Sequence, residues 1–382
     1  MASKIITQDF PKRIAINASN ITKGGGLQVA SSIIQGLENI NDSKYFVIVS
    51  SKLAKWARMT DGYMYNNVFV WIHDVPKGQN VLSGHVDSLD SFIAKNSIQV
   101  VISIFGPTYW KPKVFHICGF AKPHYIYDEL IPEGLFSKKE MFNNTLKRLI
   151  HLHNFKSFID ILYTETEDAT MRLRKLLPSK KVVTITNTYH QIYNDPNYWI
   201  DSPKMQLDDA RVILMIASLY KHKNHQIIPK VIRILKELYP EINCKFILTI
   251  NKNELGDGNS DVYDSIIFLG QVPIELCPNL YLKSDIMFLP TLLECFSASY
   301  AESMKMNVPI LTSDRPFART VCHNAAEYCD PLNETDIAEK IVMLLNNIGR
   351  RNQLIAFGKN RLNCFETSHS RLLKMLSLIP EP

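Results

Sequence analysis

Two glutamates, Glu294 and Glu302, lie eight positions apart where an expected strand gives way to an expected helix. The run SDIMFLP before them is typical of a short buried strand, and the run after residue 297 is typical of a helix. Small residues at 297–299 would let the backbone approach a ligand, and free N–H groups at a helix start favour a phosphate. A carboxylate is repelled by phosphate, so each glutamate is better suited to accept hydrogen bonds from sugar hydroxyls. The simpler alternative is one capping glutamate followed by an ordinary helical glutamate.

A second segment, MIASLYKHKNHQIIPKVI at 215–232, places cations after another expected strand. Lys221, His222 and Lys223 concentrate positive charge there. A cation at a strand end would stabilise a departing diphosphate. A solvated basic turn would have the same composition, so both interpretations stay open on these residues alone.

A third segment, NASNITKGGGLQVASSII at 17–34, carries three consecutive glycines between an expected strand and an expected helix. Gly24, Gly25 and Gly26 would allow the backbone to approach a ligand closely. The run is neither GxGxxG nor a P-loop, because no Gly-Lys-Ser/Thr follows it. By itself it is a weak indication of ligand binding.

A fourth segment, residues 105–127, contains two candidate histidines, His116 and His124. A lone histidine within a strand is more often a hydrogen-bonded core residue than a ligand contact. Four aromatic residues of the same segment could stack on sugar rings, although core packing is their commoner use. They are Tyr109, Trp110, Phe120 and Tyr125.

Apolar, β-branched runs alternate with helical patterns along the chain. The strands and helices that this alternation predicts must hold the four candidate segments in place. Near-continuous apolar strands are buried on both faces, as in a parallel sheet covered by helices. We therefore expect an α/β protein with two doubly wound domains, at 1–200 and 206–360, and a final amphipathic helix within 361–382 that packs on the first domain. The expected strands lie at 13–18, 45–50, 67–72, 99–105, 113–118, 159–164, 181–186, 211–217, 244–250, 265–269, 285–289, 308–312 and 326–329.

The boundary between the two domains falls in the polar stretch 194–209, which contains two prolines. In doubly wound sheets, ligands bind beyond the carboxyl ends of the strands and often on helix N-termini. Two such domains that face each other form one cleft. We expect the candidate segments to meet there, because each follows a strand.

Composition bounds the class of protein. The 382 residues are 46% hydrophobic and 21% charged, as in an ordinary globular protein with room for two domains. A formal net charge of +6 is mild and favours an ordinary enzyme over a nucleic-acid binder. Seven scattered cysteines without a CxxC pair favour a reducing compartment over a disulfide framework. With no signal sequence and no apolar run of about 18 residues, we expect a cytoplasmic protein.

The segment 135–157 has the pattern of a basic amphipathic helix. Such a helix could lie on an anionic membrane surface, where lipid-linked acceptors are found. A solvated helix that packs on the first domain is the alternative. The first possibility would place the protein at the inner face of the membrane.

The stretch PTLLECFSASYAESMKMNVPILTS resembles the signature of the retaining glycosyltransferases of family four, which have the two-Rossmann GT-B fold. The family frame is P-S-x-x-E-G-F-G-L-P-x-L-E-A-M-A-x-G-x-P-V-I-A-S. Three residues depart from it, with Cys295 and Ser297 in place of glycines and Ser299 in place of proline. The residues that hold the frame are Pro290, Glu294, Phe296, Glu302, Met304, Pro309 and Ser313.

The resemblance implies roles for these residues. Glu294 would contact the donor sugar, Glu302 the nucleotide ribose, and the backbone of Phe296, Ser297 and Ala298 would lie near the diphosphate. The basic segment is similar to the family run G-R-L-x-x-x-K-N, in which the arginine and the lysine bind the diphosphate. Lys223 and Asn224 match the last two positions of that run.

Ser218 stands where the family has the arginine of that run, so Lys221 or His222 would have to supply the missing charge. The three glycines resemble the family loop that lies over the donor diphosphate or the acceptor. His116 best matches the register of a family histidine that contacts the donor sugar, and His124 is the second choice. Weaker matches place Glu165 and Glu167 at another strand end and Asn187 in the run VVTITNTYHQIY.

The resemblance thus implies a metal-independent retaining glycosyltransferase that moves a sugar from a UDP- or GDP-sugar to a glycan or lipid-linked acceptor. Cell-surface polysaccharide synthesis, of the O-antigen, capsule or lipopolysaccharide kind, is the expected setting. No DxD motif follows a strand, no cofactor is expected, and no protein base is assigned because the departing phosphate assists the acceptor hydroxyl in the route proposed for the family. The alternatives are a nucleoside diphosphate sugar epimerase or a phosphorylase-like enzyme of the same fold, and a non-catalytic glycan-binding protein.

Overall fold

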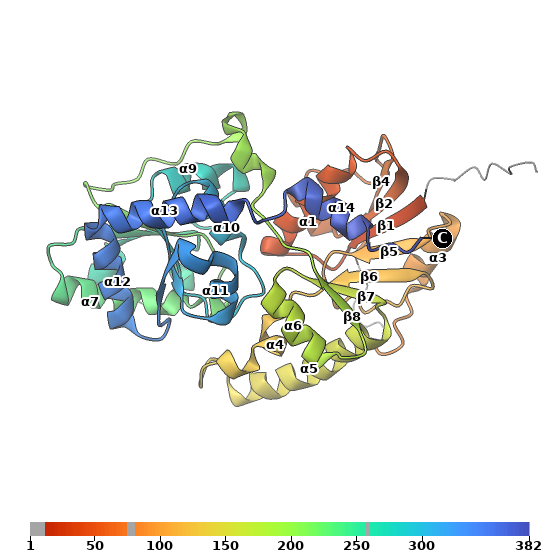
Figure 1. The fold of residues 1–382 in the computed structure, drawn as a ribbon, viewed down its shortest axis with the longest axis horizontal. Helices are drawn as coiled ribbons and strands as arrows, with labels where there is room; N and C mark the ends of the chain where they lie inside the picture. The colour runs from red at the N-terminus through yellow and green to blue at the C-terminus, as the bar shows by residue number, and fades with distance from the viewer. Residues whose placement is uncertain (1–11, 75–80, 257–259, 382) are drawn as a thin grey trace, which may run out of the picture.

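Two α/β domains lie side by side in the computed structural model (Figure 1), which describes residues 12–74, 81–256 and 260–381. Each domain contains one sheet. The N-terminal sheet has the strand order β3-β4-β2-β1-β5-β6-β7-β8, and the C-terminal sheet has the order β11-β10-β9-β12-β13-β14. All pairs are parallel except β3 with β4. This arrangement confirms the GT-B fold expected from the sequence.

The elements of the N-terminal domain alternate between strand and helix. Its strands are β1 (Lys12–Ala18), β2 (Ser43–Val49), β3 (Met64–Tyr65), β4 (Val68–Ile72), β5 (Val100–Ser103), β6 (Phe115–Gly119), β7 (Ile161–Thr164) and β8 (Lys181–Thr184). Its helices are α1 (Gly25–Leu37), α2 (Ser51–Trp56), α3 (Asp87–Lys95), α4 (Pro123–Ile126), α5 (Lys138–Ser157) and α6 (Glu167–Leu176). Every strand that the sequence predicts here is present, and the two-residue edge strand β3 is an addition to them.

The C-terminal domain repeats the pattern, and every strand predicted in it is present. Its strands are β9 (Arg211–Met215), β10 (Cys244–Leu248), β11 (Ile266–Phe268), β12 (Ile286–Leu289), β13 (Ile310–Ser313) and β14 (Ala326–Cys329). Its helices are α7 (Ile228–Leu238), α8 (Ser260–Tyr263), α9 (Cys277–Leu282), α10 (Ala298–Lys305), α11 (Pro316–Cys322), α12 (Glu334–Asn346) and α13 (Ile348–Leu362).

Burial on both faces explains why the strands are apolar throughout rather than alternating. Along β1, Ile14 and Ile16 face the cluster that includes residues of α1, whereas Ala15 faces the cluster that includes residues of α3. Every residue of β5 and of β12 is buried. Continuous apolar runs therefore predict these strands well, because neither face of the sheet is left for water.

The last helix, α14 (Ser368–Leu376), leaves the C-terminal domain and returns to the N-terminal domain, where it lies beside α1 (Figure 1). Its Leu372 and Met375 are part of the buried cluster under α1. Packing is close, since a Cβ added at Gly36 of α1 would stand 2.9 Å from the Leu372 side chain. The chain thus connects the two domains twice, before β9 and after α13.

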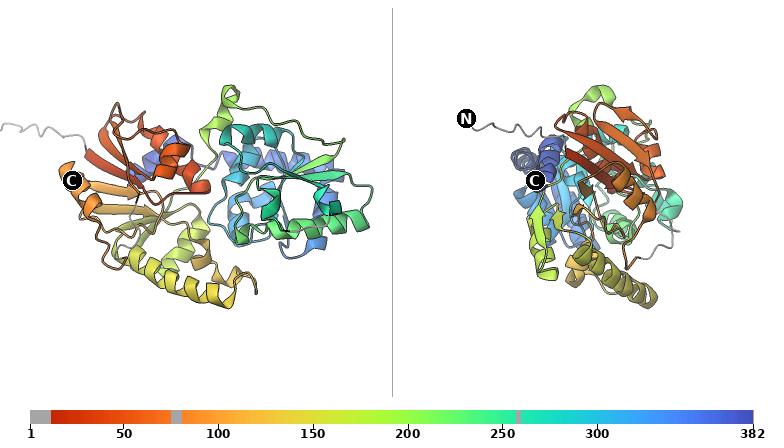
Figure 2. Two further views of the ribbon diagram at one scale, coloured as in Figure 1. Left: turned by 180° about the vertical axis from the view of Figure 1, so that it is seen from behind. Right: turned by 90° about the vertical axis from the view of Figure 1, so that its right-hand side faces the viewer.

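Helix α5 runs along the outer edge of the N-terminal domain in both views of Figure 2. It starts with a capping box, in which Ser137 accepts from the Glu140 amide and Glu140 accepts from the Ser137 amide. Among the helices in the described part of the chain, none combines the length and the hydropathy that a membrane span requires. All seven cysteines are free thiols.

Candidate active site

The segments that follow the strand ends of both sheets meet between the two domains. Gln28, in the first turn of α1, donates from Nε2 to Oε1 of Glu302 on α10 at 2.8 Å. Thr166, after β7, donates to the backbone oxygen of Cys295 at 3.4 Å. The candidate segments predicted from the sequence are therefore brought together by the fold, as expected for strand ends that face each other.

Glu294 and Lys223 form an ion pair at this interface. Glu294 lies on the loop after β12, and Lys223 ends the short 3-10 turn Lys221–Lys223 after β9. Only 14% of the Lys223 side chain and 11% of the Glu294 side chain are exposed. Burial raises the pKa of Glu294, and the nearby Lys223 ammonium opposes that rise. The pair thus places one carboxylate and one cation in a poorly solvated position, where their fields act strongly on a ligand.

The two loops that carry this pair are fixed to each other by backbone contacts. The carbonyl oxygen of His222 accepts from the Leu292 amide at 2.6 Å and from the Thr291 hydroxyl at 3.0 Å. The imidazole of His222 stacks on Tyr220, and burial followed by the Lys223 charge lowers its pKa to about 4. His222 is therefore neutral at pH 7, and it does not supply the charge that the missing arginine would carry.

Glu302 lies in α10, is 4% exposed, and has both carboxylate oxygens in use. One accepts from Gln28, and the other accepts from the Tyr281 hydroxyl at 3.1 Å. Burial raises the pKa of Glu302, whereas hydrogen bonds from Gln28, Tyr281 and Tyr193 oppose the rise. The carboxylate is thus held as a hydrogen-bond acceptor, the property that a contact to a sugar hydroxyl needs.

Helix α10 begins beside these carboxylates. Ser297 is its N-cap, in extended conformation, and its side chain makes no capping hydrogen bond. Ser299 donates to the Ile216 carbonyl at the end of β9 at 3.3 Å, which fixes the helix start against that strand. The ring of Phe296 packs on that of Phe365, with the ring centres 6.1 Å apart. The N–H groups of Ala298 and its neighbours define the positive end of this helix.

The other residues of the basic segment are engaged elsewhere. Lys221 forms an interdomain ion pair with Glu140 of α5 at 2.7 Å. Asn224 adopts a left-handed conformation and donates to the Pro331 carbonyl at 2.7 Å, which anchors the turn. Ser218 is exposed. Of the residues in this segment that were predicted to contact the diphosphate, Lys223 alone forms an ion pair with one of the two glutamates, Glu294.

The glycine loop contacts the basic segment from the opposite domain. Gly24 has a φ of 67°, and a Cβ placed on it would stand 3.1 Å from the Tyr220 hydroxyl. The Lys23 ammonium lies 5.4 Å from the centre of the Tyr220 ring. Gly25 begins α1, and Gly26 is the second residue of that helix. Glycine at 24 is therefore required by the backbone and by the close approach of Tyr220.

His116 does not lie at this interface, which argues against the donor-sugar contact expected for it. It is the second residue of β6 and is 1% exposed. Its Nε2 pairs with the Ser103 hydroxyl at 2.8 Å and its Nδ1 with the Phe158 carbonyl at 2.9 Å. Burial lowers its pKa to about 4. Both ring nitrogens are satisfied in the core, so the register places this histidine too early in the strand to reach a ligand.

His124, the second choice, lies closer to the interface. Burial, followed by the charge of Lys122 and by smaller effects of His222 and Arg148, lowers its pKa to about 4. Since His222 belongs to the C-terminal domain, His124 faces across the interface. The predicted stacking residues Trp110, Phe120 and Tyr125 are buried in the core, and Tyr109 is half-buried, with its hydroxyl 2.5 Å from Nε2 of His151.

The sequence predicts only part of a buried polar network that lies behind the interface. Glu165 accepts from Nδ2 of Asn187 at 2.6 Å, and Asn187 accepts in turn from the Arg371 guanidinium of α14. Burial raises the pKa of Glu165 to about 7, and Arg371 opposes this rise. The sequence matches Glu165 and Asn187 to family positions but gives no signal for Arg371. Gln28, Tyr281 and Tyr193 likewise follow no local pattern that would mark them as partners of Glu302.

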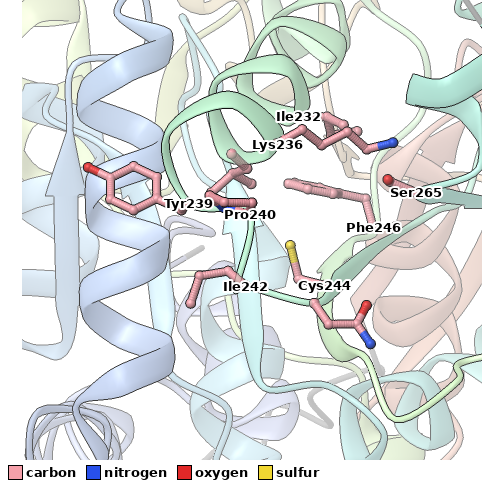
Figure 3. Close-up of a pocket in the computed structure, with 10 residues that line it drawn as sticks. Ile232, Lys236, Tyr239, Pro240, Ile242, Cys244, Phe246 and Ser265 are labelled. Carbon is pink, nitrogen blue, oxygen red and sulfur yellow. The ribbon is translucent and has the colours of Figure 1, made fainter.

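Two pockets lie away from the paired glutamates. One, of ≈ 440 Å³, is lined by Tyr239, Pro240, Cys244 and Phe246, near the start of β10 (Figure 3). It is therefore at the opposite edge of the sheet from the loop that carries Glu294. The other, of ≈ 570 Å³, lies between α10 and the segment 363–368. Neither is where a doubly wound sheet binds its ligand.

The described residues contain no group of three or more histidine, cysteine, aspartate or glutamate side chains that could hold a metal ion.

Comparison with known proteins shows which structures share this fold. The fold is shared with a glycosyltransferase from Rickettsia africae ESF-5 (TM-score 0.70, 14% identity, covering 96% of this chain and 97% of that chain). It is also shared with sucrose-phosphate synthase from Thermosynechococcus elongatus (TM-score 0.69, 11% identity, 96% and 98%). A third similar structure is WaaG, a glycosyltransferase involved in lipopolysaccharide biosynthesis (TM-score 0.67, 11% identity, 96% and 99%).

Residues 198–361 match the family model described as "Glycosyl transferases group 1". The matched region is the C-terminal domain, which carries Lys223, Glu294 and Glu302. No curated protein matches the chain. The family match and the GT-B fold together support glycosyl transfer as the activity.

Proposed function

We propose that this protein is a retaining glycosyltransferase that uses a nucleoside diphosphate sugar and transfers the sugar to a glycan or lipid-linked acceptor in cell-surface polysaccharide synthesis. The observation that carries the proposal is the buried Lys223–Glu294 pair beside Glu302 and the uncapped start of α10. It combines acceptors for sugar hydroxyls with positive charge for a diphosphate. The match of residues 198–361 supports the same class of reaction.

Each residue of the site has a separate role in the proposed reaction. Lys223 and the first N–H groups of α10 hold the negative charge that grows on the diphosphate as the bond from the sugar C1 to the phosphate oxygen breaks. Glu294 accepts hydrogen bonds from hydroxyls of the sugar, and Glu302 accepts from the ribose. The acceptor oxygen bonds to C1 on the same face, and its proton passes to the departing phosphate oxygen. No protein base is needed in this route, and no metal is assigned.

Glu302 can meet a ribose only if the Gln28 amide shares or leaves its carboxylate. Gln28 and Glu302 belong to different domains and are joined at 2.8 Å. We infer that donor binding separates these two groups and replaces the amide with ribose hydroxyls. The loss of one protein hydrogen bond is offset by new hydrogen bonds to a charged acceptor, each of about 1.5–3 kcal/mol.

A thermal-shift screen of UDP-, GDP- and dTDP-sugars tests the donor class. A ligand at about 100 times its Kd stabilises the folded state by about 2.7 kcal/mol, so one nucleotide should raise the Tm by several degrees. Glu302→Gln should weaken that ligand about 10-fold or more, because a charged acceptor is lost. Glu241→Gln, at an exposed position, is the matched control and should leave the shift unchanged. Failure of every nucleotide sugar and nucleoside diphosphate to shift the Tm would remove the proposal.

The proposed membrane contact uses the outward face of α5. Phe142, Leu146 and Leu149 follow one another at i, i+4 and i+7 and are 72%, 53% and 63% exposed. Exposed lysines flank this row, at positions 138, 139, 147 and 156. An apolar row between lysines suits the headgroup region of an anionic bilayer. This arrangement supports the membrane-surface interpretation of the helix over the solvated one, with lipid-linked acceptors at the inner face of the membrane.

Sedimentation with phosphatidylserine vesicles tests this contact. The protein should bind at low salt and be released at high salt, because about 1 kcal/mol of attraction per lysine is screened. Phe142→Ser combined with Leu146→Ser should abolish binding. Leu238→Ser, at an exposed leucine that ends α7, is the control and should have no effect. Binding that is absent at low salt in the unmodified protein would rule out the membrane role of α5.

A further inference from the structure

The pocket of ≈ 570 Å³, called the crossover pocket below, lies where the chain passes between the two domains. Residues within 188–194, on the first connection, form one wall, and residues within 359–368, at the end of α13 and on the second connection, form another. The end of α10 contributes the third wall. Small-molecule sites have volumes of about 300–1,000 Å³. Among the described residues that line this pocket, none is assigned to the donor, so it is a separate cavity.

Contacts between the three segments hold the walls of the crossover pocket in place. A Cβ added at Gly358 of α13 would stand 3.2 Å from the Met304 side chain of α10, so these two helices are closely packed. Gln191, on the first connection, donates to Gln35 of α1 at 2.8 Å. The pocket is therefore fixed to elements of both domains, and its shape depends on how the two domains are docked.

The lining of the crossover pocket is rich in groups that can bind hydroxyls. Each carboxamide side chain presents a hydrogen-bond donor and an acceptor, which match the donor and acceptor properties of sugar hydroxyls. The rings of Tyr189 and Phe365 offer apolar surface to the C–H groups of a sugar. Amides and aromatic rings in one cavity suit a saccharide better than an apolar ligand. The carboxamides in the lining are Gln191, Asn194, Asn307 and Asn363.

Positive charge is in excess in the crossover pocket. The charge of Glu366 is balanced by its ion pair with Lys374. Neither Lys305 nor Lys359 forms an ion pair with an acidic side chain in the part of the chain that the structure describes. The Lys305 ammonium lies 5.4 Å from the centre of the Tyr189 ring, so both side chains belong to the same wall. Helix α14 also begins at the pocket, and the positive end of its dipole adds to the two lysine charges.

We propose that the crossover pocket binds a saccharide that carries an acidic group. Its carboxamides and rings bind the sugar, and Lys305 and Lys359 form charge-assisted hydrogen bonds with a carboxylate or phosphate on that sugar. The site goes beyond the proposed glycosyl transfer, because it is distinct from the donor position and does not depend on the donor assignment. A saccharide bound there contacts both connections and α10 at once, and so stabilises the docked arrangement of the two domains.

The test measures the Tm of the full chain at constant ionic strength with four probes: glucuronate, glucose 6-phosphate, glucose and inorganic phosphate. At least one of the two acidic sugars is expected to raise the Tm in a saturable manner and at lower concentration than glucose or phosphate, because it engages both the carboxamides and the lysines. A response to glucuronate alone assigns a carboxylate as the acidic group, and a response to glucose 6-phosphate alone assigns a phosphate.

Lysine variants locate the bound acidic sugar. Lys359→Glu, at an exposed position, should weaken it about 10-fold or more, because a charge-assisted hydrogen bond is replaced by repulsion. Lys305→Met keeps an apolar stem beside the Tyr189 ring and should weaken the same sugar through loss of charge. Lys44→Glu, at an exposed lysine on β2, is the matched control and should leave binding unchanged. Glu302→Gln should also leave it unchanged, because Glu302 is assigned to the donor.

Three results would overturn the proposal. The first is that neither acidic sugar raises the Tm. The second is equal binding of the acidic sugar by the unmodified protein and by Lys359→Glu. The third is inorganic phosphate acting as strongly as the acidic sugars, which would indicate a simple anion site without sugar recognition. If no nucleotide binds but the effect of the acidic sugar depends on Lys359, the proposed donor class fails while the crossover site stands.

Discussion

Glu294→Gln is expected to reduce sugar transfer by about 10²–10³-fold while the protein stays folded, as for the loss of one preorganised electrostatic contact in an active site. The substitution keeps the shape of the side chain but removes the charge that pairs with Lys223. It therefore weakens both the contact to the sugar and the fixed position of the Lys223 ammonium. The measurement is the initial rate of transfer with the nucleotide sugar selected by thermal shift, together with the Tm of the variant.

A matched control comes from another ion-paired, half-buried acid in the same domain. Glu327 of β14 pairs with Lys340 at 3.3 Å and with Arg350 at 2.8 Å, away from the interface. Glu327→Gln should lower stability but leave the rate per folded molecule unchanged. Unchanged transfer by folded Glu294→Gln would show that this carboxylate has no part in the reaction. Transfer lost equally in both variants would indicate that general destabilisation, and not the site, explains the effect.

Arg371→Met is expected to lower the free energy of unfolding by about 3–5 kcal/mol, the cost of breaking a buried charged network by removing one member. Arg371 is 4% exposed and donates to Asn187 and, at 3.3 Å, to the Ser32 hydroxyl. Asn187 in turn donates to the buried Glu165. Removal of the guanidinium leaves that carboxylate without a compensating charge and removes polar contacts that hold α14 on the N-terminal domain. Urea unfolding measures the change.

The pH dependence of this loss separates the charge network from simple packing. The pKa of Glu165 is raised from 4.5 to about 7, so the folded state keeps a proton that the unfolded state releases between those values. Stability contributed by this group is therefore fully present below pH 4.5 and decreases as the pH rises to about 7. Arg371 stabilises only the ionised form, so Arg371→Met should cost more at pH 8 than at pH 5.

Two variants serve as controls for Arg371. Glu165→Gln combined with Arg371→Met removes both charges and should recover part of the lost stability. Arg174→Met removes an arginine that donates to the Val182 carbonyl at 2.7 Å, so it should cost about 1 kcal/mol. Equal losses at pH 5 and pH 8 for Arg371→Met would contradict a role for Glu165 in the network.

The sequence by itself determined the two-domain architecture and the main candidate segments. Local patterns are sufficient for this, because strands buried on both faces are apolar throughout and each is followed by a helix of period 3.6. In doubly wound sheets the order of strand and helix also dictates which edge binds ligands. Lys223, Glu294 and Glu302 could therefore be assigned to one interface without coordinates.

Only the tertiary structure decided which side chains touch. Gln28 and Glu302 are 274 positions apart, and Arg371 and Asn187 are 184 apart, so no local period relates them. The position of His116 within β6 decided where its side chain lies. Residues near the start of a strand lie in the core, and only residues beyond its carboxyl end reach the ligand-binding edge of the sheet. The ion pair between Lys221 and Glu140 likewise depends on how the two domains dock. A sequence encodes each element through its near neighbours, whereas the pairing of charges is set by distances that exist only after the domains have packed.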